Sequence, residues 1–366
     1  MALYFYRLGG KAGGAERMIC ALADGLVTRG LNVHLISWDP PNAKSFYHLN
    51  PAIRWSRLGF RAGLIDKFRR SSVLARVLRD NGISVLIGFV MSGDKTIYAA
   101  AKMASVRLIA AERNAPTMYR LRYGPIHRWI SFTLLHLADR ITVQMPNFTK
   151  GYPASLRNRI ETIPNPVSTA SLRAEPNSPG ADGRFTLLAV ARLDGVQKQL
   201  DCLIGAFSKI ATRHPSWDLR IVGDGPMAAN LRHLAADRSV ADRVIMHEST
   251  PDIFKVYARS HLFAIPSQWE GFPNALAEAL AHGLPAVGFR NAAGVADLIT
   301  DGENGWLASG LADENTLAET LEAAMANASE RARRGAQAAE SITVYSPEAQ
   351  YDRWARLIHS VAAERP

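Results

Sequence analysis

Apolar and polar positions follow two different periods along the chain. Continuous apolar runs such as SVLIGFV (84–90) and HLFAIP (261–266) are typical of strands buried on both faces. Stretches such as residues 15–30 instead repeat apolar residues every three or four positions, as amphipathic helices do. Strands are predicted at 84–90, 106–111, 140–144, 185–193, 218–225 and 261–266, and helices at 64–80, 92–103, 126–138, 199–213 and 226–236. This alternation predicts an α/β fold with doubly wound parallel sheets.

A break in this pattern divides the chain. Residues 164–183 are rich in Pro, Ser, Gly and Asn and show no periodicity, which indicates a linker. Each side of the break holds enough alternation to form its own core. We therefore expect domains at 1–167 and 168–342, followed by an amphipathic helix within 343–366 that packs on the first domain.

Charge is distributed unevenly between the halves. The net charge is +10, but residues 1–170 carry 24 Lys/Arg against 9 Asp/Glu, and the remainder carries 19 against 24. A cationic first half favours a polyanionic partner such as nucleic acid, anionic lipid or a phosphorylated substrate, or serves only solubility. The apolar runs are shorter than the ~20 residues of a bilayer span, the first residues lack a secretion signal, and the two cysteines lack metal-ligand spacing. These features predict a cytoplasmic protein.

The stretch SQWEGFPNALAEALAHGLP (267–285) carries the most specific chemistry. Glu270 follows a predicted buried strand, and Glu278 lies within the helix that Pro273 begins. Ligands of open α/β sheets bind at the carboxyl ends of strands, where helix N-termini favour phosphate. Ionised carboxylates accept hydrogen bonds from sugar hydroxyls. Each glutamate alone is more typical of a solvated acid, but the combination indicates a site for a phosphorylated, hydroxyl-bearing ligand.

Five further segments share a known order and spacing with this stretch. They are GGAER (13–17), IPNPV (163–167), VARLDGVQK (190–198), IVGDGP (221–226) and NAAGVADLITDGENGWL (291–307). Together with WEGFPNALAEALAHGLP, whose glutamates have the E-x7-E spacing, they resemble the GT4-type retaining glycosyltransferases of the GT-B fold. The resemblance covers nearly the whole chain and implies two Rossmann-like domains that face each other across a cleft.

The resemblance implies a nucleotide-sugar donor, with UDP favoured, bound to the second domain. Glu270 is implied to contact the transferred sugar and Glu278 the ribose, while Arg192 and Lys198 neutralise the diphosphate. Fixed cations and dipoles aimed at the departing phosphate stabilise its developing charge. The other positions implied at the donor are Gly271, Phe272, Pro273, Asn274, Gly223 and Gly14. No metal or other cofactor is implied.

The first domain is expected to hold the acceptor. LIAAERNAPTMYR (108–120) resembles the segment that faces the cleft in relatives acting on bacterial surface glycans. It places Glu112, Arg113 and Asn114 at a predicted strand end, and we assign none of them as a catalytic base. The acceptor implied is a glycan, either linked to a polyprenyl diphosphate or part of another cell-surface saccharide.

Residues 54–80 contain eight Lys/Arg and two acids, interleaved with apolar residues. Such a stretch is typical of an anionic membrane surface, and equally of a solvated helix whose other face packs on the sheet. The cations assigned to this surface are Arg61, Lys67, Arg69 and Arg70. A second candidate for such a surface is YRLRYGPIHRWISF (119–132), where aromatic residues lie beside arginines. The expected location is therefore the inner face of the cell membrane, with peripheral attachment.

Two other classes of protein fit part of the sequence. A basic nucleic-acid-binding protein without transferase activity fits the charge, but the chain lacks an aromatic β platform or a recognition-helix motif. A Rossmann oxidoreductase fits the first βαβ unit, but GGKAGG departs from G-x-G-x-x-G. Sugar transfer without nucleic acid as a partner is the favoured reading.

Overall fold

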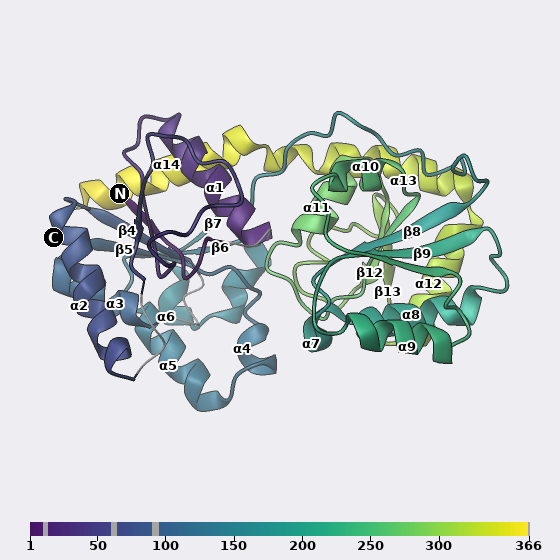
Figure 1. Cartoon of the computed structure of the whole chain (residues 1–366), viewed down its shortest axis with the longest axis horizontal. Helices are drawn as coiled ribbons and strands as arrows, with labels where there is room; N and C mark the ends of the chain where they lie inside the picture. Colours follow the sequence, from purple (N-terminus) through teal and green to yellow (C-terminus); the bar gives the residue numbers. More distant parts are fainter. Residues whose placement is uncertain (10–13, 60–63, 90–94, 365–366) are drawn as a thin grey trace. The chain divides into compact units, whose positions relative to one another are not determined.

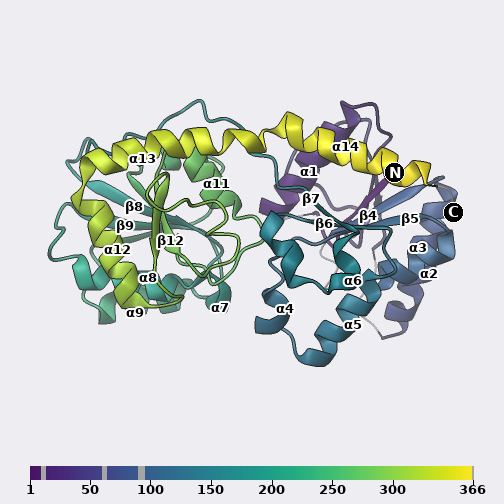
Figure 2. The ribbon, with the colours of Figure 1, turned by 180° about the vertical axis from the view of Figure 1, so that it is seen from behind.

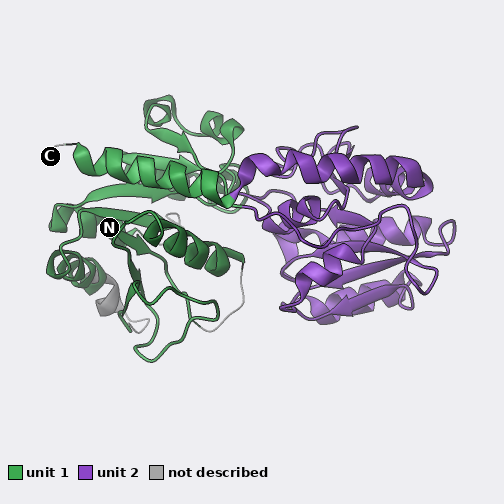
Figure 3. Ribbon diagram, turned by 90° about the horizontal axis from the view of Figure 1, so that it is seen from above, with its two compact units in different colours: residues 1–166, 347–366 green, residues 167–346 purple. Residues whose placement is uncertain are grey.

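The computed structural model describes residues 1–9, 14–59, 64–89 and 95–364, except for the side chains of residues 64–68. Arg61 and most of the glycine-rich segment 9–14 therefore lie outside the described residues. The chain forms two compact units, and Figure 3 distinguishes them by colour. Unit 1 comprises Met1–Pro166 and Pro347–Pro366, and unit 2 comprises Val167–Ser346.

Unit 1 is an α/β unit in which helices separate the strands. Its elements are β1 (Ala2–Tyr4), α1 (Gly14–Val27), β2 (His34–Ser37), β3 (Arg54–Arg57), α2 (Leu64–Asp80), β4 (Val85–Phe89), α3 (Thr96–Ala104), β5 (Arg107–Ala111), α4 (Met118–Leu121), α5 (Pro125–Leu135), β6 (Arg140–Val143), η1 (Pro146–Gly151), α6 (Ala154–Arg157), β7 (Ile160–Thr162) and α14 (Pro347–Ala363).

The sheet of unit 1 is parallel throughout, in the order β3-β2-β1-β4-β5-β6-β7. Its inner strands consist of small and apolar residues because both of their faces are covered. Helix α14 lies beside α1 (Figures 1 and 2), where Gly25 leaves room for the ring of Tyr351. Trp354 of α14 is buried in the core of this unit with its ring 6.0 Å from that of Phe89.

The basic stretch 54–80 is not one element. Arg54–Arg57 is the edge strand β3, and the helix α2 begins only at Leu64. An edge strand carries charged residues because one of its sides faces solvent. In β3 the guanidinium of Arg57 lies over the ring of Trp55, 4.0 Å from its centroid. The arginines of this strand therefore lie at the edge of the sheet, and Arg57 packs on a ring of the same strand.

Unit 2 repeats the same plan. Its elements are β8 (Phe185–Val190), α7 (Gly195–Lys198), α8 (Leu200–Ile210), β9 (Trp217–Val222), α9 (Ala228–Asp237), β10 (Val244–His247), α10 (Ile253–Ala258), β11 (Leu262–Ile265), α11 (Asn274–Ala281), β12 (Ala286–Phe289), β13 (Gly305–Ala308), α12 (Glu314–Ala326), α13 (Ala328–Ser341) and η2 (Thr343–Tyr345).

The sheet of unit 2 is also parallel, in the order β10-β9-β8-β11-β12-β13. Chain order reverses between the neighbouring strands β8 and β11, which defines the topological switch point. The prediction of two doubly wound parallel sheets is confirmed. Strand β11 contributes Phe263 to the buried core, and α8 contributes Phe207.

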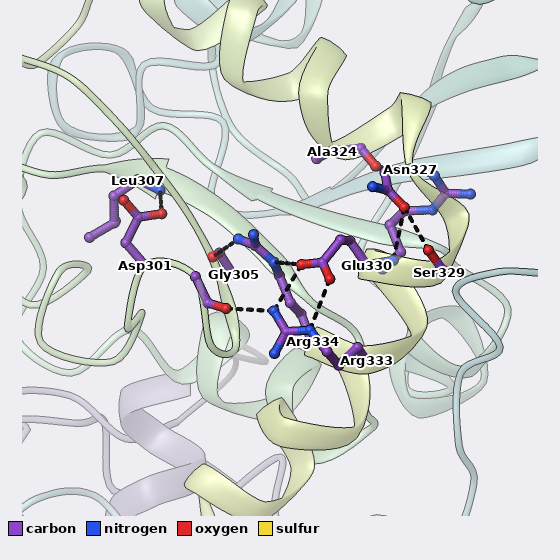
Figure 4. Close-up of polar contacts among 11 residues, drawn as sticks. Asp301, Gly305, Leu307, Ala324, Asn327, Ser329, Glu330, Arg333 and Arg334 are labelled. Carbon is purple, nitrogen blue, oxygen red and sulfur yellow. Dashed lines mark hydrogen bonds and ion pairs between the residues drawn. The ribbon is translucent and has the colours of Figure 1, made fainter.

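Helix α13 is fixed at its start and along its exposed face. The side chain of Asn327 accepts a hydrogen bond from the backbone N–H of Glu330, which caps the helix. Glu330 in turn pairs with Arg333 and Arg334, and Arg334 donates to the carbonyl of Gly305 at 2.7 Å (Figure 4). These contacts attach α13 to the beginning of β13.

A buried histidine makes the stability of unit 2 depend on pH. His261 is 5% exposed, its Nδ1 accepts the N–H of Thr186 at 2.8 Å, and its ring lies against Phe185. Burial lowers the pKa of His261 from 6.5 to about 4. Between pH 6.5 and pH 4 this histidine binds a proton in the unfolded chain but not in the folded chain. His261 therefore contributes stability that is lost as the pH falls from 6.5 towards 4.

We expect the thermal midpoint of unfolding to decrease from pH 7 to pH 4.5 by more in the wild type than in His261→Asn. The Asn Oδ1 replaces the Nδ1 acceptor but does not titrate in this range. Scanning calorimetry of both proteins at the two pH values measures the difference. Parallel decreases in the two proteins would contradict this assignment.

Candidate active site

The predicted donor residues lie around the switch point of unit 2. Lys198 ends α7, which follows β8, and Glu270 follows β11. Since β8 and β11 are neighbouring parallel strands, their carboxyl ends lie side by side. This is the position at which open α/β sheets bind ligands.

Lys198 and Glu270 form a largely buried ion pair. The Lys198 Nζ lies 2.6 Å from the Glu270 Oε1, and their side chains are 16% and 9% exposed. Neighbouring Gln197 donates through Nε2 to the carbonyl of Trp269 at 2.9 Å and accepts at its own carbonyl from the N–H of Gln268. These hydrogen bonds join α7, which carries Lys198, to the loop after β11, which carries Glu270. They therefore fix the two residues of the pair relative to each other.

Helix α11 begins directly after this pair. Gly271, Phe272 and Pro273 are buried, and Asn274 opens the helix. Among the described residues the N-cap residue Pro273 makes no side-chain cap hydrogen bond, and the positive end of the helix dipole lies at this segment. The segment 270–274 thus combines a carboxylate, an ammonium partner and a helix N-terminus.

Gly294 allows another loop to lie on this segment. The Glu270 N–H donates to the carbonyl of Ala293 at 2.8 Å, which brings the backbone of Gly294 against that of Glu270. Gly294 has φ +82°, and a Cβ at this position would overlap the Glu270 carbonyl oxygen. The glycine is therefore required by close backbone approach.

Arg192 lies in the loop after β8 and is exposed. Its Nη2 is 3.0 Å from the Asp194 Oδ2, and its side chain is 73% exposed. Gly223, at the end of β9, packs so closely that a Cβ would overlap the carbonyl oxygen of Ala191. The Leu193 N–H then donates to the Asp224 carbonyl at 2.8 Å. Gly223 therefore shapes the loop that carries Arg192.

Glu278 is half-buried on α11, and its Oε2 accepts a hydrogen bond from the Tyr257 hydroxyl at 3.1 Å. Neither Tyr257 nor Gln197 was predicted from the sequence. Gln197 directly precedes Lys198 and was identifiable as its neighbour, whereas nothing in the local pattern of α10 indicated Tyr257. Gly14 begins α1 in unit 1 and is exposed, so its role at the donor stays a prediction.

Two family models match consecutive parts of the chain. The model described as Glycosyltransferase Family 4 matches residues 12–171, and the model described as Glycosyl transferases group 1 matches residues 173–341. The chain is a GT4-type glycosyltransferase of the GT-B fold. The E-x7-E spacing of Glu270 and Glu278 is present in the sequence.

The glycosyltransferase is similar to proteins of several bacteria. It is 28% identical to an uncharacterised glycosyltransferase of Haemophilus influenzae, over 81% of this chain and 83% of that protein. It is 24% identical to the N-acetylgalactosamine-N,N'-diacetylbacillosaminyl-diphospho-undecaprenol 4-alpha-N-acetylgalactosaminyltransferase of Campylobacter jejuni, over 88% of each. Anabaena HepE in complex with UDP and glucose has a TM-score of 0.78 at 16% identity and covers 98% of this chain and 99% of its own.

In unit 1 of the glycosyltransferase, the carboxylate of Glu112 is hydrogen-bonded within the protein. The residue is 4% exposed, and its Oε2 accepts from the hydroxyls of Tyr119 at 2.7 Å and Tyr152 at 3.0 Å. Burial raises the pKa of Glu112, and the two hydroxyl donors act against this shift. The carboxylate therefore joins α4 and the residue after η1 to the end of β5.

Arg113 and Asn114 follow Glu112 and are partly exposed. The Arg113 guanidinium donates to the Asn165 side chain and lies 5.6 Å from the centroid of the Phe89 ring. Burial lowers the pKa of Arg113. For Glu112, Arg113 and Asn114 alike, the role on the acceptor side stays a prediction.

Four cations were predicted to form a surface on and before α2, and the structure describes the side chains of two of them, Arg69 and Arg70. Arg61 lies outside the described residues, and the side chain of Lys67 is not described. Arg69 is exposed, as predicted for a surface residue. The assignment of Arg70 to the surface is wrong, because this residue is 8% exposed and its guanidinium lies over the rings of Trp38 and Tyr6.

Two further properties bear on the expected partners. Across residues 1–9, 14–59, 64–89 and 95–364, no three His, Cys, Asp or Glu side chains are grouped as metal ligands. None of the helices in the described part of the chain combines the length and the apolar character that a membrane span requires.

Proposed function

We propose that the enzyme is a retaining glycosyltransferase that moves a sugar from a nucleotide-sugar, with UDP favoured, to a lipid-linked or other cell-surface glycan. The observation that carries the proposal is the Lys198–Glu270 pair at the switch point, beside the start of α11. The name of the C. jejuni relative supports a diphospho-undecaprenol-linked acceptor, and the complex of HepE supports UDP. A lipid-linked acceptor suits a cytoplasmic enzyme attached peripherally to the inner face of the membrane.

The proposed site stabilises the negative charge that develops on the departing diphosphate. The bond between the anomeric carbon and the phosphate oxygen breaks, and the acceptor oxygen forms its bond to the same face of that carbon. The acceptor proton passes to the departing phosphate oxygen. Lys198, Arg192 and the first turn of α11 supply fixed positive charge and dipoles for this oxygen, which lowers the barrier without reorganisation.

Glu270 has two roles in this proposal. Its carboxylate fixes the position of the Lys198 ammonium, and its remaining acceptor capacity binds hydroxyls of the transferred sugar. Gly271, Phe272, Pro273 and Asn274 bring the start of α11 to the same ligand. These side chains and amides perform the charge stabilisation that a divalent cation supplies in other transferases, so we expect chelation by EDTA to leave turnover unchanged.

Glu278 is proposed to accept hydrogen bonds from the ribose. We expect Glu278→Gln to weaken nucleotide binding about tenfold, because a hydrogen bond to a charged group contributes roughly 1.5–3 kcal/mol and the amide keeps part of it. Calorimetric titration with UDP measures the dissociation constant. Tyr257→Phe, which removes the hydroxyl that donates to this carboxylate, is the matched control and should retain most of the affinity. Equal affinity of wild type and Glu278→Gln would contradict the ribose role.

A panel of nucleotide-sugars tests the proposal as a whole. A ligand that binds only the folded chain raises its melting temperature in proportion to the logarithm of its concentration over Kd. We expect one UDP-sugar to give the largest increase and to be hydrolysed slowly without acceptor. The absence of any shift across UDP-, GDP- and ADP-sugars at millimolar concentration would contradict the proposed donor class.

A further inference from the structure

The α4–α5 surface of unit 1 exposes apolar side chains. It is formed by Leu121, Arg122, Ile126, Arg128 and Trp129. Ile126 is 74% and Trp129 is 68% exposed, although a helix on a globular protein normally turns its polar residues outward. Both helices lie along one edge of the unit (Figures 1 and 2). Leu121 of α4 is 47% exposed, so each of the two helices exposes an apolar side chain.

Positive charge predominates around this surface. Residues 112–161 contain eight Lys/Arg and three acids, Glu112, Asp139 and Glu161. Glu112 is buried and bound by the hydroxyls of Tyr119 and Tyr152, and Asp139 is bound by Arg107 at 2.6 Å and by the N–H of Leu108. Arg122 and Arg128 are exposed beside the apolar residues. The local field is therefore cationic, and it favours an anionic partner.

We propose that the α4–α5 surface docks on the headgroup region of an anionic phospholipid bilayer. Trp and Ile then enter the boundary between headgroups and acyl chains, where an amphipathic ring is most stable. Arg122 and Arg128 pair with lipid phosphates, which adds affinity for each charge near the surface. A pocket of about 480 Å³ beside the surface, lined in part by Arg128, Trp129, Phe132 and His136, has room for a headgroup.

The combination of charges and apolar residues favours lipid over nucleic acid. A bilayer uses both features together, whereas nucleic-acid affinity depends mainly on cations and on aromatic rings stacked with bases. Trp129 is the exposed aromatic ring of the α4–α5 surface, whereas the half-buried rings of Tyr123 and His127 stack on each other, 4.1 Å apart. The inference does not rest on the proposed donor, because docking is measured without any nucleotide-sugar.

The test is sedimentation of the full chain with vesicles of phosphatidylcholine alone and of phosphatidylcholine with phosphatidylglycerol. We expect binding to the anionic vesicles that weakens as salt increases. Ile126→Ser with Trp129→Ala, and separately Arg122→Glu with Arg128→Glu, should each reduce the bound fraction at least about tenfold. All four positions are exposed, so the variants should fold normally.

Two controls and a spectroscopic measurement sharpen the result. Phe46→Ala removes another exposed aromatic residue of unit 1, 58% exposed, and Lys102→Glu reverses an exposed cation of α3. Both should bind vesicles as the wild type does. All seven tryptophans lie in the described part of the chain, and among them Trp129 alone is exposed. Vesicles should therefore shift tryptophan emission to the blue in the wild type but not in Trp129→Ala.

Three outcomes would overturn the proposal. The first is a wild type that does not bind anionic vesicles at 0.1 M salt, and the second is loss of binding in Lys102→Glu but not in the α4–α5 variants. The third is binding of single-stranded RNA, but not of vesicles, that depends on Arg122 and Arg128. Sugar transfer to a soluble acceptor is scored separately, so a failed docking test leaves the proposed reaction standing.

Discussion

Glu270→Gln should reduce sugar transfer by about a hundredfold or more while leaving the melting temperature within a few degrees of the wild type. The substitution keeps the size of the side chain but removes the charge that fixes Lys198. Removing one preorganised stabilising group costs roughly 10²–10³ in rate in comparable sites. Single-turnover transfer with the donor found by the panel measures the loss, and KM for the donor shows whether binding changes with it.

The matched control is Glu303→Gln, an exposed glutamate of the same unit, which should transfer sugar at the wild-type rate. Lys198→Met and the double variant complete a cycle, because two residues that act together lose less in combination than the sum of their single losses. Wild-type turnover of a well-folded Glu270→Gln protein would remove Glu270 from the catalytic residues.

The central strands were predictable from the sequence for a physical reason. Strands β4 and β11 are covered on both faces, so SVLIGFV and HLFAIP read as continuous apolar runs. The edge strand β3 was not predicted, because RWSR carries two charges and resembles the start of the basic helix that follows. Helices α12 and α13 were also missed, since no single strong apolar stripe separates them from the neighbouring loops.

Only part of the site was accessible from the sequence. The resemblance placed Lys198 and Glu270 at one ligand, but they are 72 residues apart, and spacing alone could not predict their ion pair. Counting charges also could not show which arginines face solvent. Arg69 and Arg70 are identical neighbours in the sequence, but only Arg69 is exposed. Arg70 packs over Trp38 because it lies on the buried face of α2.

Arg331→Met should lower the free energy of unfolding of unit 2 by about 3 kcal/mol or more. The Arg331 side chain is buried and donates to the carbonyls of Ala324, Met325 and Pro176. The first two lie in the last turn of α12, where no further helical N–H is available. Each buried carbonyl left without a donor costs roughly 1–3 kcal/mol. The guanidinium also lies about 5 Å from the ring centroids of Phe185 and Trp217, and this contact is lost as well.

Arg333→Met is the matched control, because it removes an arginine from the same helix where the side chain is 49% exposed and pairs with Glu330 (Figure 4). Surface ion pairs contribute about 0–1 kcal/mol, so this variant should unfold close to the wild type. Urea unfolding followed by circular dichroism gives both midpoints, and the difference should appear without a change in slope. Because Pro176 lies in the non-periodic segment before β8, hydrogen exchange should increase there in Arg331→Met alone. Equal midpoints for the two variants would show that the orphaned carbonyls find water, and that Arg331 does not hold this segment to the end of α12.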